Sequence, residues 1–140
     1  MKNLVFAFAL LCSTSLVAQF SYNANDTGIQ SPNATASGDY STAMGISTTA
    51  SGDVSTAMGY GTTSSGDVST AMGSGTTASG FVSTAMGTTT TASGNYSTAM
   101  GNNTNAQDYL SFVIGSLNKT DETPNPTVFS LQNTAFVIGN

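Results

Sequence analysis

The chain is poor in the side chains from which most catalytic and ligand-binding sites are built. Among its 140 residues there is no histidine and no tryptophan, and 6% are charged. The cationic residues are Lys2 and Lys119 alone, and the formal net charge is -5. These absences exclude a histidine-based triad, a histidine-ligated metal and an arginine clamp on phosphate, and they disfavour nucleic acid, whose phosphates require clustered Lys and Arg. We therefore expect no enzyme activity, no cofactor and no nucleic-acid partner.

Cysteine and long hydrophobic runs are equally scarce. The single cysteine, Cys12, lies in an N-terminal segment where Lys2 precedes an apolar run over residues 4–11, followed by small and polar residues. This three-part pattern is typical of a secretory signal peptide, which we assign to residues 1–18. Its removal leaves a mature chain without cysteine. The apolar run is shorter than the roughly 20 residues that cross a bilayer, so we expect no membrane span in this chain.

Small residues fill more than half of the chain, with 20 Ser, 23 Thr, 16 Ala and 15 Gly. They follow a gapless repeat of 14 residues that starts at Thr35. A disordered linker of this composition has no need of such a frame. The five copies read TASGDYSTAMGIST, TASGDVSTAMGYGT, TSSGDVSTAMGSGT, TASGFVSTAMGTTT and TASGNYSTAMGNNT.

The repeat sets the predicted domain organisation. A lead-in segment over residues 19–34 precedes a head of six coils over residues 35–118, whose sixth copy, NAQDYLSFVIGSLN, carries larger apolar residues as a cap would. A loop containing Pro124 and Pro126 is inserted at residues 119–132. Residues 133–140 begin a further coil with AFVIG, and an ending inside this motif suggests a piece of a longer protein.

The alternation within each copy is that of β-strands. Tyr40, Thr42 and Met44 fall on one face of an extended segment, and Ser41 and Ala43 fall on the other. Glycine recurs at the fourth and eleventh places of all five copies, which fits turns that need positive φ or a close backbone approach. The sequence therefore predicts an all-β fold, a parallel β-roll in which 14-residue coils of two short strands stack about 4.8 Å apart as a single-chain solenoid.

Each coil offers little apolar material: one Met, one Val or Tyr, and one or two Ala. Ordering its backbone costs about 1–2 kcal/mol per residue, so a single roll is marginal. We expect Met, Val and Tyr to fill the coil interior. We expect the small face, represented by Ser55, Ala57 and Gly59, to lie against other copies of the chain around an axis. A monomeric roll whose small face meets water is the alternative.

The motifs of this repeat resemble the SVAIG-type head repeats of YadA-like trimeric autotransporter adhesins, and the resemblance covers residues 35–118 and resumes at Asn133. It implies a left-handed β-roll assembled as a homotrimer, secreted through the signal peptide and displayed at the bacterial outer membrane. There it implies a non-enzymatic adhesin that binds an extracellular protein or a cell-surface ligand. The motifs are STAMG at 41–45, 55–59, 69–73, 83–87 and 97–101, SFVIG at 111–115 and AFVIG at 135–139.

The position after the STAMG glycine varies freely among otherwise near-identical copies, which favours an outward-facing contact site. Phe81 stands where the other four copies have Asp or Asn, and we expect it to be exposed at a turn. The candidate binding positions are Ile46, Tyr60, Ser74, Phe81, Thr88 and Asn102.

Two further patterns suggest other functions. Asp39, Asp53 and Asp67 occupy adjacent coils and could attract Ca²⁺, but Phe81 and Asn95 interrupt the series, so we interpret them as solvated turn residues and expect no metal. Rows of Thr make an ice-binding β-solenoid the alternative function. Against it, adjacent Thr point to opposite faces, and no T-x-T double row runs through the copies. The rows are Thr42, Thr56, Thr70, Thr84 and Thr98, and the pairs 48–49, 62–63, 76–77 and 90–91.

Overall fold

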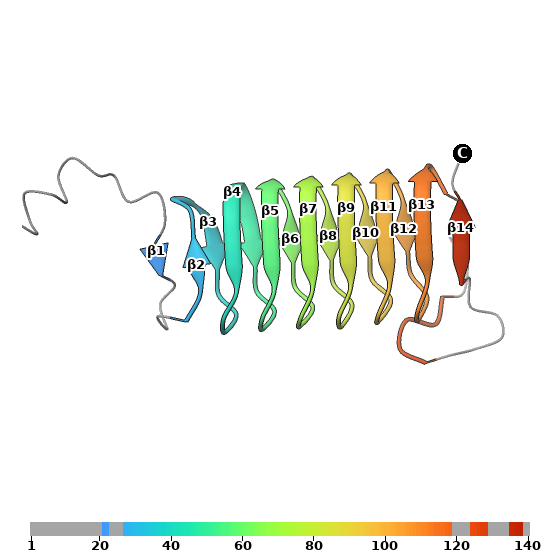
Figure 1. Cartoon of the computed structure of the whole chain (residues 1–140), viewed down its shortest axis with the longest axis horizontal. Helices are drawn as coiled ribbons and strands as arrows, with labels where there is room; N and C mark the ends of the chain where they lie inside the picture. Colours follow the sequence, from blue (N-terminus) through green and yellow to red (C-terminus); the bar gives the residue numbers. More distant parts are fainter. Residues whose placement is uncertain (1–20, 23–26, 119–123, 129–134, 139–140) are drawn as a thin grey trace, which may run out of the picture.

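The computed structural model describes residues 21–22, 27–118, 124–128 and 135–138. Within these residues the chain winds into a single stack of coils, seen from the side in Figure 1. The predicted signal peptide, residues 1–18, lies outside the described residues. In the part of the chain that the structure describes, there is no apolar helix of membrane-spanning length.

Each coil contributes one longer and one shorter strand, and β4 (Thr42–Ala50) runs through both layers of its coil. The longer strands pair in parallel with a shift of 14 residues, as Thr56 does with Thr70, and form what we call the long-strand sheet. The shorter strands form the short-strand sheet behind it (Figure 1). The longer strands are β4 (Thr42–Ala50), β5 (Thr56–Tyr60), β7 (Thr70–Ser74), β9 (Thr84–Thr88), β11 (Thr98–Asn102) and β13 (Phe112–Ser116). The shorter strands are β3 (Asn33–Ala36), β6 (Thr63–Ser64), β8 (Thr77–Ala78), β10 (Thr91–Ala92) and β12 (Asn105–Ala106). This confirms the predicted parallel β-roll of 14-residue coils.

Each coil consists of two equivalent halves, which in the second copy read TASGDVS and TAMGYGT. The sixth residue of each half has a left-handed backbone, with φ of 56° at Val54 and 60° at Gly61. This conformation points its N–H along the stack: Val54 N–H donates to the Asp39 carbonyl at 2.7 Å, and Gly61 N–H donates to the Ile46 carbonyl at 2.9 Å. Both turns of a coil are thus bonded to the preceding coil in the same way.

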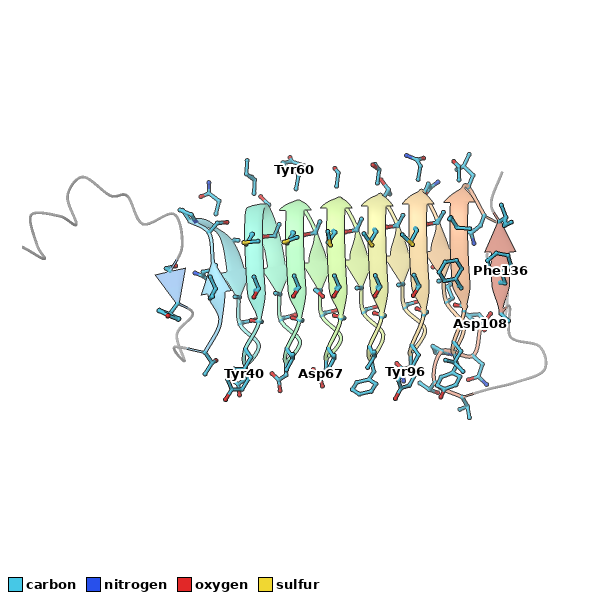
Figure 2. The ribbon with its side chains drawn as sticks, viewed as in Figure 1. Tyr40, Tyr60, Asp67, Tyr96, Asp108 and Phe136 are labelled. Atoms are coloured by element: carbon cyan, nitrogen blue, oxygen red, sulfur yellow. The ribbon has the colours of Figure 1, made fainter. Side chains whose placement is uncertain are left out.

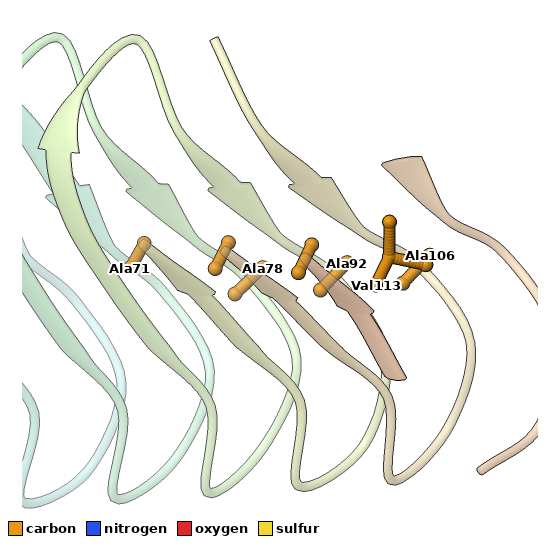
Figure 3. Close-up of a cluster of buried hydrophobic side chains, with 7 residues drawn as sticks. Ala71, Ala78, Ala92, Ala106 and Val113 are labelled. Atoms are coloured by element: carbon orange, nitrogen blue, oxygen red, sulfur yellow. The ribbon is translucent and has the colours of Figure 1, made fainter. Parts of the chain in front are cut away.

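Small residues fill the coil interior. In the second copy Ala50, Ser55, Ala57 and Thr62 are each 0% exposed. Figure 3 shows the alanines of successive coils lying between the two sheets, with Val113 at the end of the cluster. The core of this protein is therefore a set of ladders of Ala, Ser and Thr.

The structure corrects the expected assignment of the two strand faces. Met, Val and Tyr, predicted to fill the interior, lie outside: Val54 is 53% exposed and Met58 is half-buried. Ser55 and Ala57, predicted to meet another chain, lie inside their own coil. The physical reason is space, because a coil that turns within every seven residues holds its two sheets too close for larger side chains.

Glycine serves both purposes predicted for it. A Cβ on Gly66 would lie 2.1 Å from the carbonyl oxygen of Gly80 in the next coil, so close stacking requires its absence. Gly59 combines a similar approach, 2.0 Å to the Gly73 oxygen, with a φ of +124°. In the sixth copy Asp108 takes the place equivalent to Gly66. Beyond this copy, the next strand among the described residues is β14 (Phe136–Ile138).

Both ends of the stack are covered by irregular pairing. At the N-terminal end, within the predicted lead-in, β2 (Ile29–Gln30) pairs in parallel with β4, and β1 (Ser21–Tyr22) pairs antiparallel with β2. At the other end β14 (Phe136–Ile138) pairs with β13. The Asn118 side chain bonds to both the N–H and the carbonyl of Asn105, at 2.6 and 2.9 Å, as a strand would on the edge of β12.

Candidate functional site

The outer surface of the long-strand sheet carries two uniform rows. Thr at the first place of each strand and Met at the third point outward and are half-buried, and the methionine sulfurs form one line across the strands in Figure 2. We call this surface the Thr/Met face. Its methionines are Met44, Met58, Met72, Met86 and Met100.

The Thr/Met face becomes strongly apolar in the last two strands. Phe112 and Phe136 continue the Thr row, and their rings stack at 5.7 Å between centroids with an interplanar angle of 17°. Ile114 and Ile138 continue the Met row and are 40% and 72% exposed. In the single chain this end of the face leaves four large apolar side chains in contact with water, which is unfavourable unless another molecule covers them.

Five of the six candidate binding positions form one row. Ile46 pairs with Tyr60, Tyr60 with Ser74, and the register continues through Thr88 to Asn102 at the ends of the longer strands. All five side chains are exposed, at the edge where Figure 2 labels Tyr60, and we call them the variable edge. Phe81 is also exposed, but its ring contacts Tyr96, which Figure 2 labels at the opposite edge, so it does not belong to this row.

The opposite edge carries the acidic and amide residues of the fifth repeat position. Asp53 Oδ1 accepts the backbone N–H of Asp39 at 3.0 Å, and Asp67 Oδ1 accepts that of Asp53 at 3.0 Å. Asn95 Oδ1 does the same for Phe81 at 2.9 Å. These side chains bond the turn of one coil to the next. Among the described residues there is no group of three His, Cys, Asp or Glu that could hold a metal ion.

Phe81 breaks this series and begins an aromatic one. It has no acceptor to offer the N–H of Asp67, but its ring meets Tyr96 edge to face at 5.5 Å, and Tyr96 meets Tyr109 in the same way at 5.6 Å. Such ring pairs each stabilise by about 0.5–1.5 kcal/mol beyond their burial. The residue at position 81 thus exchanges a backbone hydrogen bond for ring packing.

The described part of the predicted loop, residues 124–128, folds back on this edge. Asn125 N–H donates to the buried Asp108 carboxylate at 2.8 Å, and the Asn125 carbonyl accepts the N–H of Tyr109 at 2.8 Å. The Pro126 carbonyl accepts the N–H of Asn95 at 2.7 Å. The loop therefore takes over, for the last coils, the bonding that Asp and Asn supply elsewhere.

The Thr rows do not form an ice-binding surface. Thr48, Thr62, Thr76 and Thr90 are at most 1% exposed, because they point into the coil. Of the outward rows, the one containing Thr56 lies on the long-strand sheet and the one containing Thr63 on the short-strand sheet. No face of the described stack carries two adjacent Thr rows, so the ice-binding alternative finds no support.

Sequence reasoning missed the equivalence of the two half-coils, whose signal is the shared pattern T-A-x-G-x-x-S/T. It therefore also missed the row at the sixth repeat position: Tyr40, Val54, Val68, Val82, Tyr96 and Leu110.

Comparison with known proteins identifies the family of the repeats. The YadA head domain repeat matches residues 32–48, 36–62, 50–76 and 78–104, which together span half of the chain. No curated protein and no solved structure matches the chain. The matched segments contain the repeats whose stacking is described above, and the chain belongs to the YadA head domain repeat family.

Proposed function

We propose that this chain is the head of a homotrimeric, non-enzymatic adhesin displayed on the outer membrane of a bacterium after secretion through the signal peptide at residues 1–18. YadA-type heads form trimers, and their family is one of bacterial cell-surface adhesins. What is proposed for this chain is its own assembly, its export and its ability to bind an extracellular protein or a cell-surface ligand.

The observation that carries the proposal is the Thr/Met face. It repeats without change from β4 to β11, contains no charged residue, and ends in Phe112, Ile114, Phe136 and Ile138, which remain exposed in the single chain. A flat, uncharged surface of this kind favours burial against identical surfaces, and three copies around an axis would each cover the others.

Assembly is tested on the mature chain, residues 19–140, by sedimentation velocity. We expect a trimer, and we expect F112T/I114M to weaken it. Thr and Met occupy these two places in five other coils, so the substitution keeps the fold while reducing apolar area. A folded monomer at every concentration would contradict the proposed assembly.

Adhesion is proposed to use the variable edge. Since Ser74 shows that serine fits this row, I46S/Y60S removes the two large apolar side chains without disturbing the coil. We expect this variant to bind less to immobilised collagen, fibronectin or laminin than the unchanged trimer, whereas T63S on the short-strand sheet serves as the matched control. Equal binding by a trimeric I46S/Y60S would show that the variable edge is not the adhesive surface.

A further inference from the structure

The two turns of every coil offer an internal comparison. At both turns the sixth residue of the half-coil has φ between 52° and 64°, and from the second copy on its N–H donates to the preceding coil. Left-handed backbone favours Gly and Asn and is costly for β-branched residues. Two turns with the same backbone conformation should therefore contain the same kinds of residue, unless a constraint other than the backbone determines the residue at one of them.

The turn near the variable edge follows this expectation in most copies. Its left-handed position holds Ser, Gly, Gly, Thr, Asn and Leu in successive coils. Four of these six are Ser, Gly or Asn, which are small or tolerate positive φ. The residues are Ser47, Gly61, Gly75, Thr89, Asn103 and Leu117.

The other turn does the opposite in all six copies. Its left-handed position always holds a large apolar residue, and three times a valine, the least suited to positive φ. Five of the six side chains are exposed, with exposed fractions of 70% for Tyr40, 53% for Val54, 45% for Val68, 44% for Tyr96 and 53% for Leu110, and Val82 is half-buried. We call this row the turn stripe; it comprises Tyr40, Val54, Val68, Val82, Tyr96 and Leu110.

The turn stripe is unfavourable twice in the isolated chain, through its backbone conformation and through its exposure. It lies beside the Thr/Met face, since Val54 precedes the outward Thr56 and Met58 by two and four residues. In Figure 2 Tyr40 and Tyr96 are labelled along the edge from which the longer strands start. The stripe therefore extends the uncharged outer surface of the long-strand sheet around its edge.

We propose that the turn stripe is a lateral contact between neighbouring subunits, in which it packs against a second copy of this chain; this rests on the trimer of the proposed function. Two arguments favour this occupant. The stripe repeats in register with the coils for the length of the stack, and a second copy has the same spacing along its own stack. The methionines of the adjoining face are already half-buried, so in the central coils the stripe adds exposed apolar side chains that assembly can still remove from water.

The test compares the stability of the single subunit with the dissociation constant of the trimer, because the same substitutions should affect the two differently. In V54N/V68N/V82N each valine is replaced by a residue that tolerates left-handed backbone, and Asn103 shows that asparagine fits the equivalent turn. The subunit should be no less stable. The trimer should dissociate more readily, by about a hundredfold for each subunit released, because burying the exposed part of one valine corresponds to about fivefold and each subunit carries three of them.

Sedimentation velocity over a wide range of concentration measures the effect, with T89N as the matched control at the other turn. T89N should leave the dissociation constant unchanged. If the wild type is trimeric and V54N/V68N/V82N is as tight or tighter, the stripe is not a subunit contact, although the proposed trimer stands. If the wild type forms higher assemblies of trimers that the triple variant reduces to trimers, the stripe joins separate heads, and the inference is wrong. A wild type that is monomeric throughout overturns both proposals.

Discussion

Replacing Gly66 by alanine tests whether close stacking of the coils holds this protein together. The added Cβ would lie 2.1 Å from the oxygen and 2.7 Å from the carbon of the Gly80 carbonyl. Both are backbone atoms, so no side chain can move aside to make room. The two coils must separate by about 1 Å to restore ordinary contact.

That separation would weaken the bonds that join these coils, among them Ser65 N–H to the Ala78 carbonyl at 2.9 Å and Gly66 N–H to the same oxygen at 3.3 Å. Two or three hydrogen bonds at about 0.5–1.5 kcal/mol each, with about 1–3 kcal/mol of packing strain, give a loss of about 2–7 kcal/mol. This is a large part of the 5–15 kcal/mol that is typical of a folded domain.

The measurement is the free energy of unfolding in urea, followed by far-ultraviolet circular dichroism at one fixed protein concentration because assembly contributes to stability. Gly61→Ala is the control: it has φ of +60° but no heavy atom within 4 Å of the added Cβ, so it should cost only about 1–2 kcal/mol. If Gly66→Ala costs no more than Gly61→Ala, the close approach of coils is not what this glycine provides.

Three further outcomes follow from the contacts at the turns and faces. Asp108→Ala removes the acceptor of the Asn125 N–H and should cost about 1–2 kcal/mol, seen as faster hydrogen exchange over residues 124–128, whereas Asp108→Asn keeps an acceptor and should change little. Phe81→Asn supplies the acceptor that the Asp67 N–H lacks from position 81, and should slow exchange of that amide about fivefold; an unchanged rate would contradict the role assigned to the fifth repeat position. Thermal hysteresis should be absent, because one of the Thr rows is buried; a clear gap between melting and freezing would contradict this reading.

The repeat predicted the parallel roll, the 14-residue register and the two glycine positions, because each follows from the spacing of residues along the chain. It could not predict which strand face lies inside. Alternation along the strand assigns Ser55 and Ala57 to one face and Thr56 and Met58 to the other, but it does not say which of the two faces is buried. The rule that larger apolar residues are buried then favoured Met58, and it failed because the coil is too narrow to hold it.

The candidate site likewise has features that the sequence predicts and features that it does not. The residues at the freely varying repeat position are exposed, and the register places Ile46 and Tyr60 side by side, whereas their role in binding stays a prediction. The turn stripe could not be predicted from the sequence. Valine disfavours a left-handed backbone, so nothing in the sequence indicates this conformation, and it is recognised only when the backbone is known. The hydrogen bond between Asn125 and Asp108 joins residues 17 apart, and because Asn125 lies outside the repeat, the repeat spacing does not predict it.

Because the central coils touch only their neighbours and meet them through the same strand pairing, the gene can gain or lose whole copies without redesign. Loss of residues 63–76 would join Thr62 to Thr77, which then takes the place of Thr63 beside Thr49. The rod becomes shorter by one step of about 4.8 Å and is otherwise the same. Unequal recombination between copies so similar in sequence can therefore change the length of the stack in fixed increments of one coil.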